Sequence, residues 1–358
     1  MPKHATDVRS AETPTARALR AVLACVPMIK IESISAESGE AVWNPDLIAR
    51  LKVHGRPHLL VCGFKASGQP RFARAMLLEL RDDIRHRATR ATPVLIAPYL
   101  SPAVRQMCID AGVSYLDLNG NVRLSFGGIF IERVTAEKPA AHRRALKSLF
   151  SPKSAQVLRS MLVQPTRTWR VSELAEHSRV SLGHVSNVRS ALLDREWALA
   201  ARSSGLALSN PDAILDAWRE VYVVPPGTHA RFYTPLHGSA FLAAAKKAFS
   251  RNTDSRRVAF SSFSAAHWLA PFARSGMHHF LADDEGLVAL QETLGLTRVT
   301  KGENVVITVP KDLGLLADVV EPAPGVVCTG PIQTYLDLSV AGERGLEAAD
   351  FLRRALLS

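Results

Sequence analysis

Two short apolar runs in the first part of the chain constrain its fold more than any other feature. Residues 58–62 (HLLVC) and 93–97 (PVLIA) have the length of strands and are bounded by turn residues. Such runs are typical of strands that are buried on both faces. Residues 71–84 lie between them and carry apolar side chains at helical spacing. A strand, a helix and a strand in this order predict a parallel pair with the crossover helix packed on the sheet.

The pattern extends on both sides of this unit. Residues 16–26 are helical in composition, and residues 101–111 begin with a Ser-Pro pair typical of a helix N-terminus. Residues 47–53, 114–118 and 121–126 are predicted strands. We therefore expect residues 1–137 to form an α/β domain with a mostly parallel sheet.

Basic residues are concentrated in the middle of the chain. Residues 138–210 contain 12 Lys and Arg against 4 Asp and Glu, whereas residues 1–137 contain 18 against 13 and residues 211–358 contain 14 against 16. A polyanion-binding surface explains this concentration, because each cation near a phosphate releases condensed counterions. A solubilising patch is the alternative.

Two changes in composition divide the chain. Residues 136–145 have the proline, small residues and clustered bases of a linker, and the Asn210-Pro211 pair favours a turn before the next helix. We expect four segments: the α/β domain at residues 1–137, a basic linker at 138–150, a small helical domain at 151–210 and a mixed α/β C-terminal domain at 211–358.

Residues 151–210 have the pattern of a winged helix-turn-helix. Residues 154–162 form an amphipathic first helix, Ser172 is expected to cap the second and Ser181 the third. In the third helix, Val185, Val188 and Leu192 would form one buried stripe. Residues 198–202 and 206–209 are β-prone and would form a hairpin in the position of a wing.

The exposed face of the third helix carries small polar residues, which suit close approach to DNA better than Glu–Lys pairs do. Asn187 would pair with an adenine edge, and His184 would reach a base or a phosphate. Hydroxyl groups and arginines would contact the phosphates. The candidate DNA-binding residues are Arg170, Ser181, Gly183, His184, Ser186, Asn187, Arg189, Arg195 and Arg202. A helix-turn-helix used for protein docking or dimerisation is the alternative.

Asp46 and Lys65 stand where one large class of metal-dependent nucleases places catalytic residues. That class holds Mg²⁺ with an Asp ahead of a strand and with an acid two positions before a Lys on the next strand. Here the second acid is replaced by Gly63. We therefore expect a vestigial site without catalytic residues, metal or cofactor. A turn residue and a surface cation are the alternative roles for Asp46 and Lys65.

Several short motifs carry a resemblance to a known family. Residues 63–71 (GFKASGQPR), 96–102 (IAPYLSP) and 111–121 (AGVSYLDLNGN) resemble the N-terminal restriction-endonuclease-like domain of AbiEi-type antitoxin regulators. Residues 330–338 (GPIQTYLDL) and 345–349 (GLEAA) are also similar to that family. The resemblance implies that the protein is the antitoxin of a type IV toxin–antitoxin system. Such an antitoxin represses its own operon and counteracts a nucleotidyltransferase toxin. Gly63 departs from the acid-x-Lys motif of members with a complete nuclease-like site.

The C-terminal segment is slightly acidic, so we expect it to bind a partner protein rather than DNA. His267, His278 and His279 match no ligand spacing, and Asp283, Asp284 and Glu285 are expected in a solvated turn, so no metal site is predicted. The four cysteines lie far apart without a CxxC pair, and no uncharged run is long enough to cross a membrane. These features favour a cytoplasmic protein.

The sequence thus favours a DNA-binding transcriptional regulator and antitoxin that acts on double-stranded DNA of its own promoter. A Mg²⁺-dependent endonuclease or repair enzyme targeted by the winged helix is the first alternative, and a protein-binding scaffold is the second. A homodimer and the presence of a cognate toxin stay open at this stage.

Overall fold

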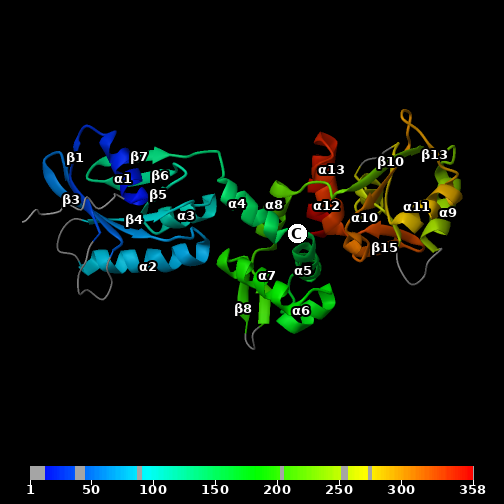
Figure 1. The fold of residues 1–358 in the computed structure, drawn as a ribbon, viewed down its shortest axis with the longest axis horizontal. Coiled ribbons are helices and arrows are strands. Elements are labelled where there is room, and N and C mark those ends of the chain that lie inside the picture. The colour runs from blue at the N-terminus through cyan, green and yellow to red at the C-terminus, as the bar shows by residue number, and fades with distance from the viewer. Residues whose placement is uncertain are drawn as a thin grey trace, which may run out of the picture. The chain divides into compact units, whose positions relative to one another are not determined.

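The computed structural model describes residues 13–36, 45–86, 91–201, 205–250, 257–272 and 276–357 (Figure 1). The chain divides into two compact units. Unit 1 consists of Met1–Arg144 with Leu192–Glu196, and unit 2 of Ala145–Ala191 with Trp197–Ser358. Both units combine helices with a seven-stranded sheet, so the fold class is mixed α/β, as predicted.

The sheet of unit 1 contains seven strands in chain order. They are β1 (Ile29–Ser35), β2 (Leu47–Val53), β3 (Arg56–Phe64), β4 (Ala91–Ala97), β5 (Ser114–Asp117), β6 (Val122–Phe126) and β7 (Ile129–Arg133). Only the pairs β3–β4 and β4–β5 are parallel, and the other four pairs of this sheet are antiparallel. The prediction of a mostly parallel sheet is therefore wrong.

Short turns explain the antiparallel pairs. His54 and Gly55, with positive φ angles of 48° and 77°, connect β2 to β3, and Gly127 and Gly128, at 55° and 81°, connect β6 to β7. A two-residue turn with positive φ at both positions joins antiparallel neighbours, whereas a parallel pair requires a longer crossover. The crossover helices α2 (Pro70–His86) and α3 (Pro102–Asp110) are found only where strands are parallel.

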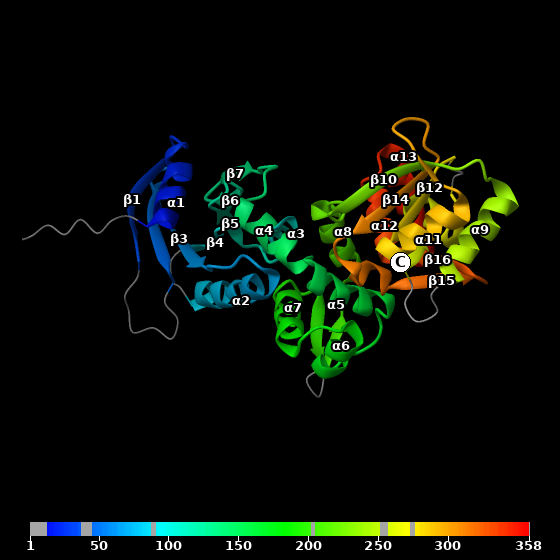
Figure 2. The same cartoon turned by 45° about the vertical axis from the view of Figure 1, so that its right-hand side comes forward.

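Helices cover both faces of this sheet (Figures 1 and 2). Helix α1 (Pro14–Ala24) packs Leu19 and Leu23 on the face that includes Leu60, while α2 and α3 pack on the face that includes Val61. Adjacent strand residues therefore lie in different cores, as the pleat of a strand requires. Helix α4 (Ala140–Leu149) forms in the segment expected as a basic linker.

After the end of α4, three helices and a hairpin follow in unit 2, except that the last residues of the third helix, Leu192–Asp194, belong to unit 1. The helices are α5 (Pro152–Val163), α6 (Val171–Ser178) and α7 (Leu182–Asp194), and the hairpin consists of β8 (Ala198–Ala201) and β9 (Gly205–Leu208). Trp169 adds a bridge to Leu206 with two backbone hydrogen bonds of 2.9 and 2.8 Å. The elements fall at the predicted positions, and Figure 2 shows α7 beside α5, with α6 below them.

The start of α6 differs from the prediction that Ser172 caps it. Arg170 has extended backbone before the helix, and its N–H donates to Oε2 of Glu173 at 3.1 Å. Because the glutamate at the third helical position binds this N–H, the helix begins one residue before Ser172. Ser172 lies in the first turn and is exposed.

The rest of unit 2 is built on a second seven-stranded sheet in the order β13-β10-β14-β12-β11-β16-β15. The strands are β10 (Gly227–Tyr233), β11 (Val258–Phe260), β12 (His278–Ala282), β13 (Thr297–Arg298), β14 (Val305–Pro310), β15 (Val319–Ala323) and β16 (Val326–Thr329). The helices are α8 (Pro211–Val221), α9 (Gly238–Ser250), α10 (Ser262–Leu269), α11 (Asp284–Leu294), the short η2 (Leu313–Leu316), α12 (Pro331–Ser339) and α13 (Glu343–Leu356).

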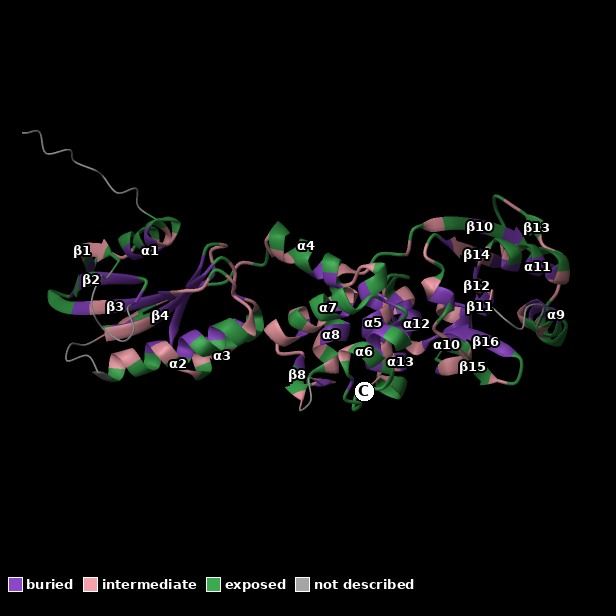
Figure 3. Cartoon of the chain, turned by 60° about the horizontal axis from the view of Figure 1, so that its bottom comes forward, coloured by how far each residue is buried: buried purple, intermediate pink, exposed green. Residues whose placement is uncertain are grey.

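The two faces of this sheet form separate cores. Phe260 and Phe280 pack against α9 and α11 on one face, whereas Ala259 and Leu281 pack near Leu315 of η2 on the other. Figure 3 shows buried residues concentrated in the strands and on the inner sides of the helices. Among the described residues, no helix combines the length and the apolar character that crossing a membrane requires.

The acidic run at residues 283–285 forms a helix N-terminus, so its prediction as a solvated turn is wrong. Asp283 is the N-cap of α11, and its Oδ1 accepts the N–H of Gly286 at 2.7 Å. Asp284 and Glu285 occupy the first turn, where carboxylates interact favourably with the helix dipole. A capping acid followed by an apolar stripe indicates this arrangement in sequence.

Candidate functional sites

The N-terminal half of α7 presents a polar, uncharged surface. Ser181 precedes the helix, and its Oγ accepts the N–H of His184 at 3.4 Å. The predicted stripe is buried, because Val185, Val188 and Leu192 are each at most 2% exposed. The opposite side is exposed throughout and consists of Ser181, Gly183, Ser186, Asn187 and Ser190. No charged residue is exposed on this side, and Leu182, which is 57% exposed at the first position of the helix, is its one large apolar side chain among the described residues.

His184 is partly buried and has an internal partner that the sequence did not predict. Its Nε2 lies 2.9 Å from Oγ of Ser154 on α5, and Ser154 is only 4% exposed. The imidazole therefore ties α7 to α5 through one ring nitrogen. Only the other nitrogen, Nδ1, is left for an external contact, so the sequence-based role of His184 is reduced.

The candidate arginines differ in exposure. Arg170 is exposed, whereas Arg189 and Arg195 are partly buried. The Nε of Arg189 lies buried without a hydrogen bond to the described residues, and burial lowers the pKa of the Arg195 guanidinium while Asp194 opposes that shift. Arg170 is thus the best placed of the three for a phosphate contact. Arg202 lies outside the described residues.

Two exposed cations of residues 151–210 were not among the candidates. Arg179 ends α6 in the left-handed conformation, at φ 54°, in the short turn that leads to α7. Arg167 places its guanidinium 3.8 Å from the centre of the Trp169 ring. The turn at Arg179-Val180 can be read from the sequence, but the left-handed backbone of Arg179 cannot.

The nuclease-like positions of unit 1 do not form a complete acid–acid–lysine set. Oδ2 of Asp46 accepts the N–H of Phe64 at 2.6 Å, and Nζ of Lys65 lies 3.7 Å from Oε2 of Glu79. A Cβ atom at Gly63 would meet Sδ of Met76 at 2.1 Å. Met76 is 2% exposed, so the space where a second carboxylate would lie is filled by a buried thioether.

A buried polar network joins α5 to the second sheet domain within unit 2. Nη2 of Arg159 donates to Oε1 of Gln333 at 2.9 Å, and Nε2 of Gln333 donates to Oδ1 of Asp337 at 2.9 Å. The Tyr222 hydroxyl donates to the same Asp337 oxygen at 2.5 Å. Burial raises the pKa of Asp337 to about 6, against the hydrogen bonds from Tyr222 and Gln333 and the charge of Arg159.

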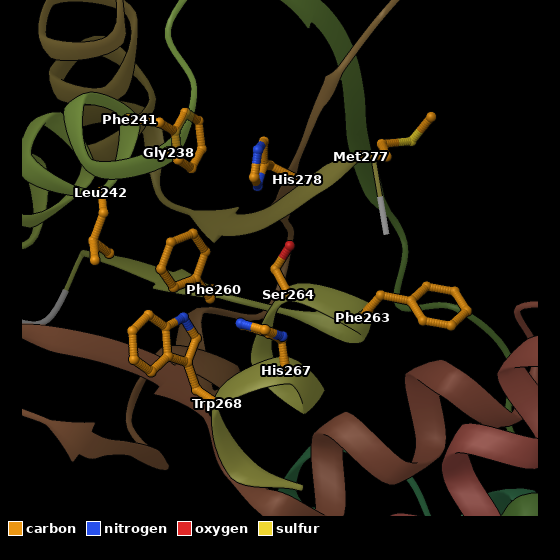
Figure 4. Close-up of a pocket in the computed structure, with 10 residues that line it drawn as sticks. All are labelled: Gly238, Phe241, Leu242, Phe260, Phe263, Ser264, His267, Trp268, Met277 and His278. Carbon is orange, nitrogen blue, oxygen red and sulfur yellow. The ribbon is translucent and has the colours of Figure 1, made fainter. Parts of the chain in front are cut away.

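A pocket of about 520 Å³ lies between α9, α10, β11 and β12 (Figure 4). Phe241 and His278 line one side, His267 and Trp268 of α10 line the other, and Ser264 lies between them. His279, the third predicted histidine, follows His278 on β12 and lines a different cavity. Among the described residues, no group of three or more His, Cys, Asp or Glu is arranged to hold a metal ion.

The comparisons with known proteins give no relative. No protein-family model matches the chain. No curated protein matches it either, and neither does any solved structure. The function is therefore argued from the sites themselves.

Proposed function

We propose that residues 151–210 are a winged helix-turn-helix that binds double-stranded DNA, and that the protein is a cytoplasmic transcriptional regulator acting on its own promoter. The observation that supports this proposal best is the uncharged, exposed side of α7 behind a capped N-terminus. It lies in the segment where Lys and Arg exceed Asp and Glu by 12 to 4. Helix amides and hydroxyls would hold phosphates while Asn187 faces base edges.

The hairpin of β8 and β9 supports the assignment of a wing to this module. It follows α7 directly and is fixed to the strand-like residue Trp169, as a wing beside a recognition helix requires. Arg170 and Arg179 lie at the start and end of α6 and would contact the phosphates on either side of α7.

The motifs that resemble those of AbiEi-type antitoxins extend the proposal. We infer a restriction-endonuclease-like fold for residues 1–137, a C-terminal domain that binds a protein, and a nucleotidyltransferase toxin as that protein. Unlike residues 138–210, residues 211–358 have no excess of basic residues, since they contain 14 Lys and Arg against 16 Asp and Glu. This balance suits a protein partner better than a polyanion.

The test of DNA binding is fluorescence anisotropy with the full-length protein. The probes are the duplex upstream of its own gene and a scrambled duplex of equal length and composition. We expect the native duplex to bind at least tenfold more tightly. Equal affinity for the two duplexes would remove the regulator proposal, and a neighbouring gene for a nucleotidyltransferase would support the antitoxin part independently.

A Mg²⁺-dependent nuclease is the competing function, and the packing of Met76 against Gly63 speaks against it. Incubation of the full-length protein with supercoiled plasmid and Mg²⁺ or Mn²⁺ separates the two functions. We expect no nicking above the background of an Asp46→Ala variant. Nicking that this substitution abolishes would establish a nuclease.

A further inference from the structure

The pocket of Figure 4 lies in a part of unit 2 that the DNA-binding proposal does not use. Its volume of about 520 Å³ falls within the range of small-molecule sites. It is built on secondary structure rather than on loops: Phe241 comes from α9, Phe260 from β11 and His278 from β12, and α10 supplies Ser264, His267 and Trp268. Such a pocket is held in shape before any ligand binds.

The walls of the pocket are flat and aromatic. The rings of Phe241 and His278 stack with centroids 3.7 Å apart and planes 20° apart, and Phe260 is 2% exposed beside them. On the opposite side, the rings of Trp268 and His267 meet edge to face, with their centroids 5.8 Å apart. None of the ten lining residues is Lys, Arg, Asp or Glu. A flat, uncharged ring system fits these walls, since aromatic faces gain most from stacking.

Polar groups project into this aromatic pocket. The rings of His267 and His278 make no hydrogen bond within the described part of the chain. Oγ of Ser264 accepts the N–H of His279 at 2.8 Å, so its own hydrogen is directed elsewhere. Burial, with smaller contributions from His279 and His267, lowers the pKa of His278, which favours a neutral ring with one donor and one acceptor. A purely apolar ligand would leave these groups desolvated and unpaired.

The backbone around the pocket is strained at one point. Ser262, the first residue of α10, has a φ of 48°, a conformation that is costly for a residue with a Cβ atom. The N–H of the preceding Ser261 donates to the carbonyl of His279 at 2.9 Å, which ties the start of α10 to β12. This link fixes Ser264 and His267 on one side and His278 on the other.

We propose that this pocket binds a neutral heteroaromatic ring of the nucleobase class, as a free base or nucleoside. Nucleobases combine a flat stacking face with an edge of alternating donors and acceptors, the two properties that the walls and the polar groups demand. The lack of lysine and arginine in the lining argues against a ligand held by its phosphates.

The test is isothermal titration calorimetry of the full-length protein with adenosine, guanosine, cytidine and uridine, and with choline and indole for comparison, each up to 5 mM. We expect at least one nucleoside to bind, and His267→Phe and His278→Phe each to weaken that binding at least tenfold. His229→Phe, which changes an exposed histidine of β10 outside this pocket, serves as the matched control and should bind as the wild type does. Thermal unfolding of each variant verifies that the chain is folded.

Three results would overturn the proposal: no binding of any nucleoside, equal binding by the wild type and both pocket variants, or tighter binding of choline or indole. Choline would indicate an aromatic cage for a cation, and indole a purely apolar pocket. Because no DNA is present in this assay, its failure leaves the DNA-binding proposal intact, and the reverse also holds.

Discussion

At the scale of single residues, Asn187 is the side chain of α7 that would read sequence. Its amide is exposed, and an Asn–adenine pair contributes about 1–3 kcal/mol of discrimination. We predict that Asn187→Ala reduces the preference for the native duplex over a scrambled duplex about 5- to 150-fold. Arg170→Ala should instead weaken binding to both duplexes by the same factor. Anisotropy titrations of both variants check this, and equal losses on both duplexes for Asn187→Ala would contradict its assignment.

Gly63 shows why an acid cannot be restored by one substitution. We predict that Gly63→Ala lowers the free energy of unfolding by about 1–3 kcal/mol, because a Cβ atom there overlaps buried Met76. Gly183→Ala is the matched control, since a Cβ at that helical position meets nothing within 4 Å. That change should be neutral or stabilise by up to about 1 kcal/mol. Urea unfolding measures both, and equal effects would refute the packing argument.

At the scale of elements, the Ser154–His184 hydrogen bond holds α7 against α5. Ser154→Ala leaves a ring nitrogen of His184 without its partner, so we predict a loss of about 1–2 kcal/mol of stability and weaker DNA binding. Ser160→Ala is the control on the same helix, because its Oγ donates only to the carbonyl of Gln156. If both variants bind the native duplex as the wild type does, the α5–α7 link has no part in recognition.

The network from α5 to α12 predicts a dependence of stability on pH. Burial raises the pKa of Asp337 from its ordinary 3.8 to about 6, so between these values the folded state binds more protons than the unfolded state. Its contribution to stability is therefore complete below about pH 4 and is lost as the pH rises through about 6. The total is at most about 3 kcal/mol.

We expect the difference in unfolding free energy between the wild type and Asp337→Asn to decrease by up to about 3 kcal/mol from pH 4 to pH 7. Asp284→Asn controls for the removal of one exposed carboxylate from the same unit. A difference that stays constant across this range for Asp337→Asn would show that the carboxyl group is ionised throughout.

Local patterns in the sequence predicted the elements well, and long-range pairing poorly. The stripe of Val185, Val188 and Leu192 and the helix start at Ser101 depend on neighbouring residues, and both are found as expected. Strand pairs such as Gly227 with Pro310 join segments that no periodicity connects. For the same reason the aromatic pocket was not predicted, because Phe241, Trp268 and His278 come together only after the second sheet forms.

At the scale of the whole molecule, the central claim is that the basic segment at residues 138–210 binds duplex DNA. Binding that releases counterions weakens with salt, and the logarithm of the affinity falls by about 0.9 per phosphate contact for each tenfold rise in salt. The exposed Arg167, Arg170 and Arg179 are the cations expected to make such contacts.

The most direct test is the salt dependence of the affinity of the full-length protein for its upstream duplex, measured from 50 to 300 mM KCl. A variant in which Arg167, Arg170 and Arg179 are all alanine is measured in parallel. We predict that the logarithm of the wild-type affinity decreases steeply and linearly with the logarithm of the salt concentration. For the variant, the magnitude of this slope should be smaller by about 2–3. A wild-type affinity that does not change with salt, or the same slope for both proteins, would contradict the account.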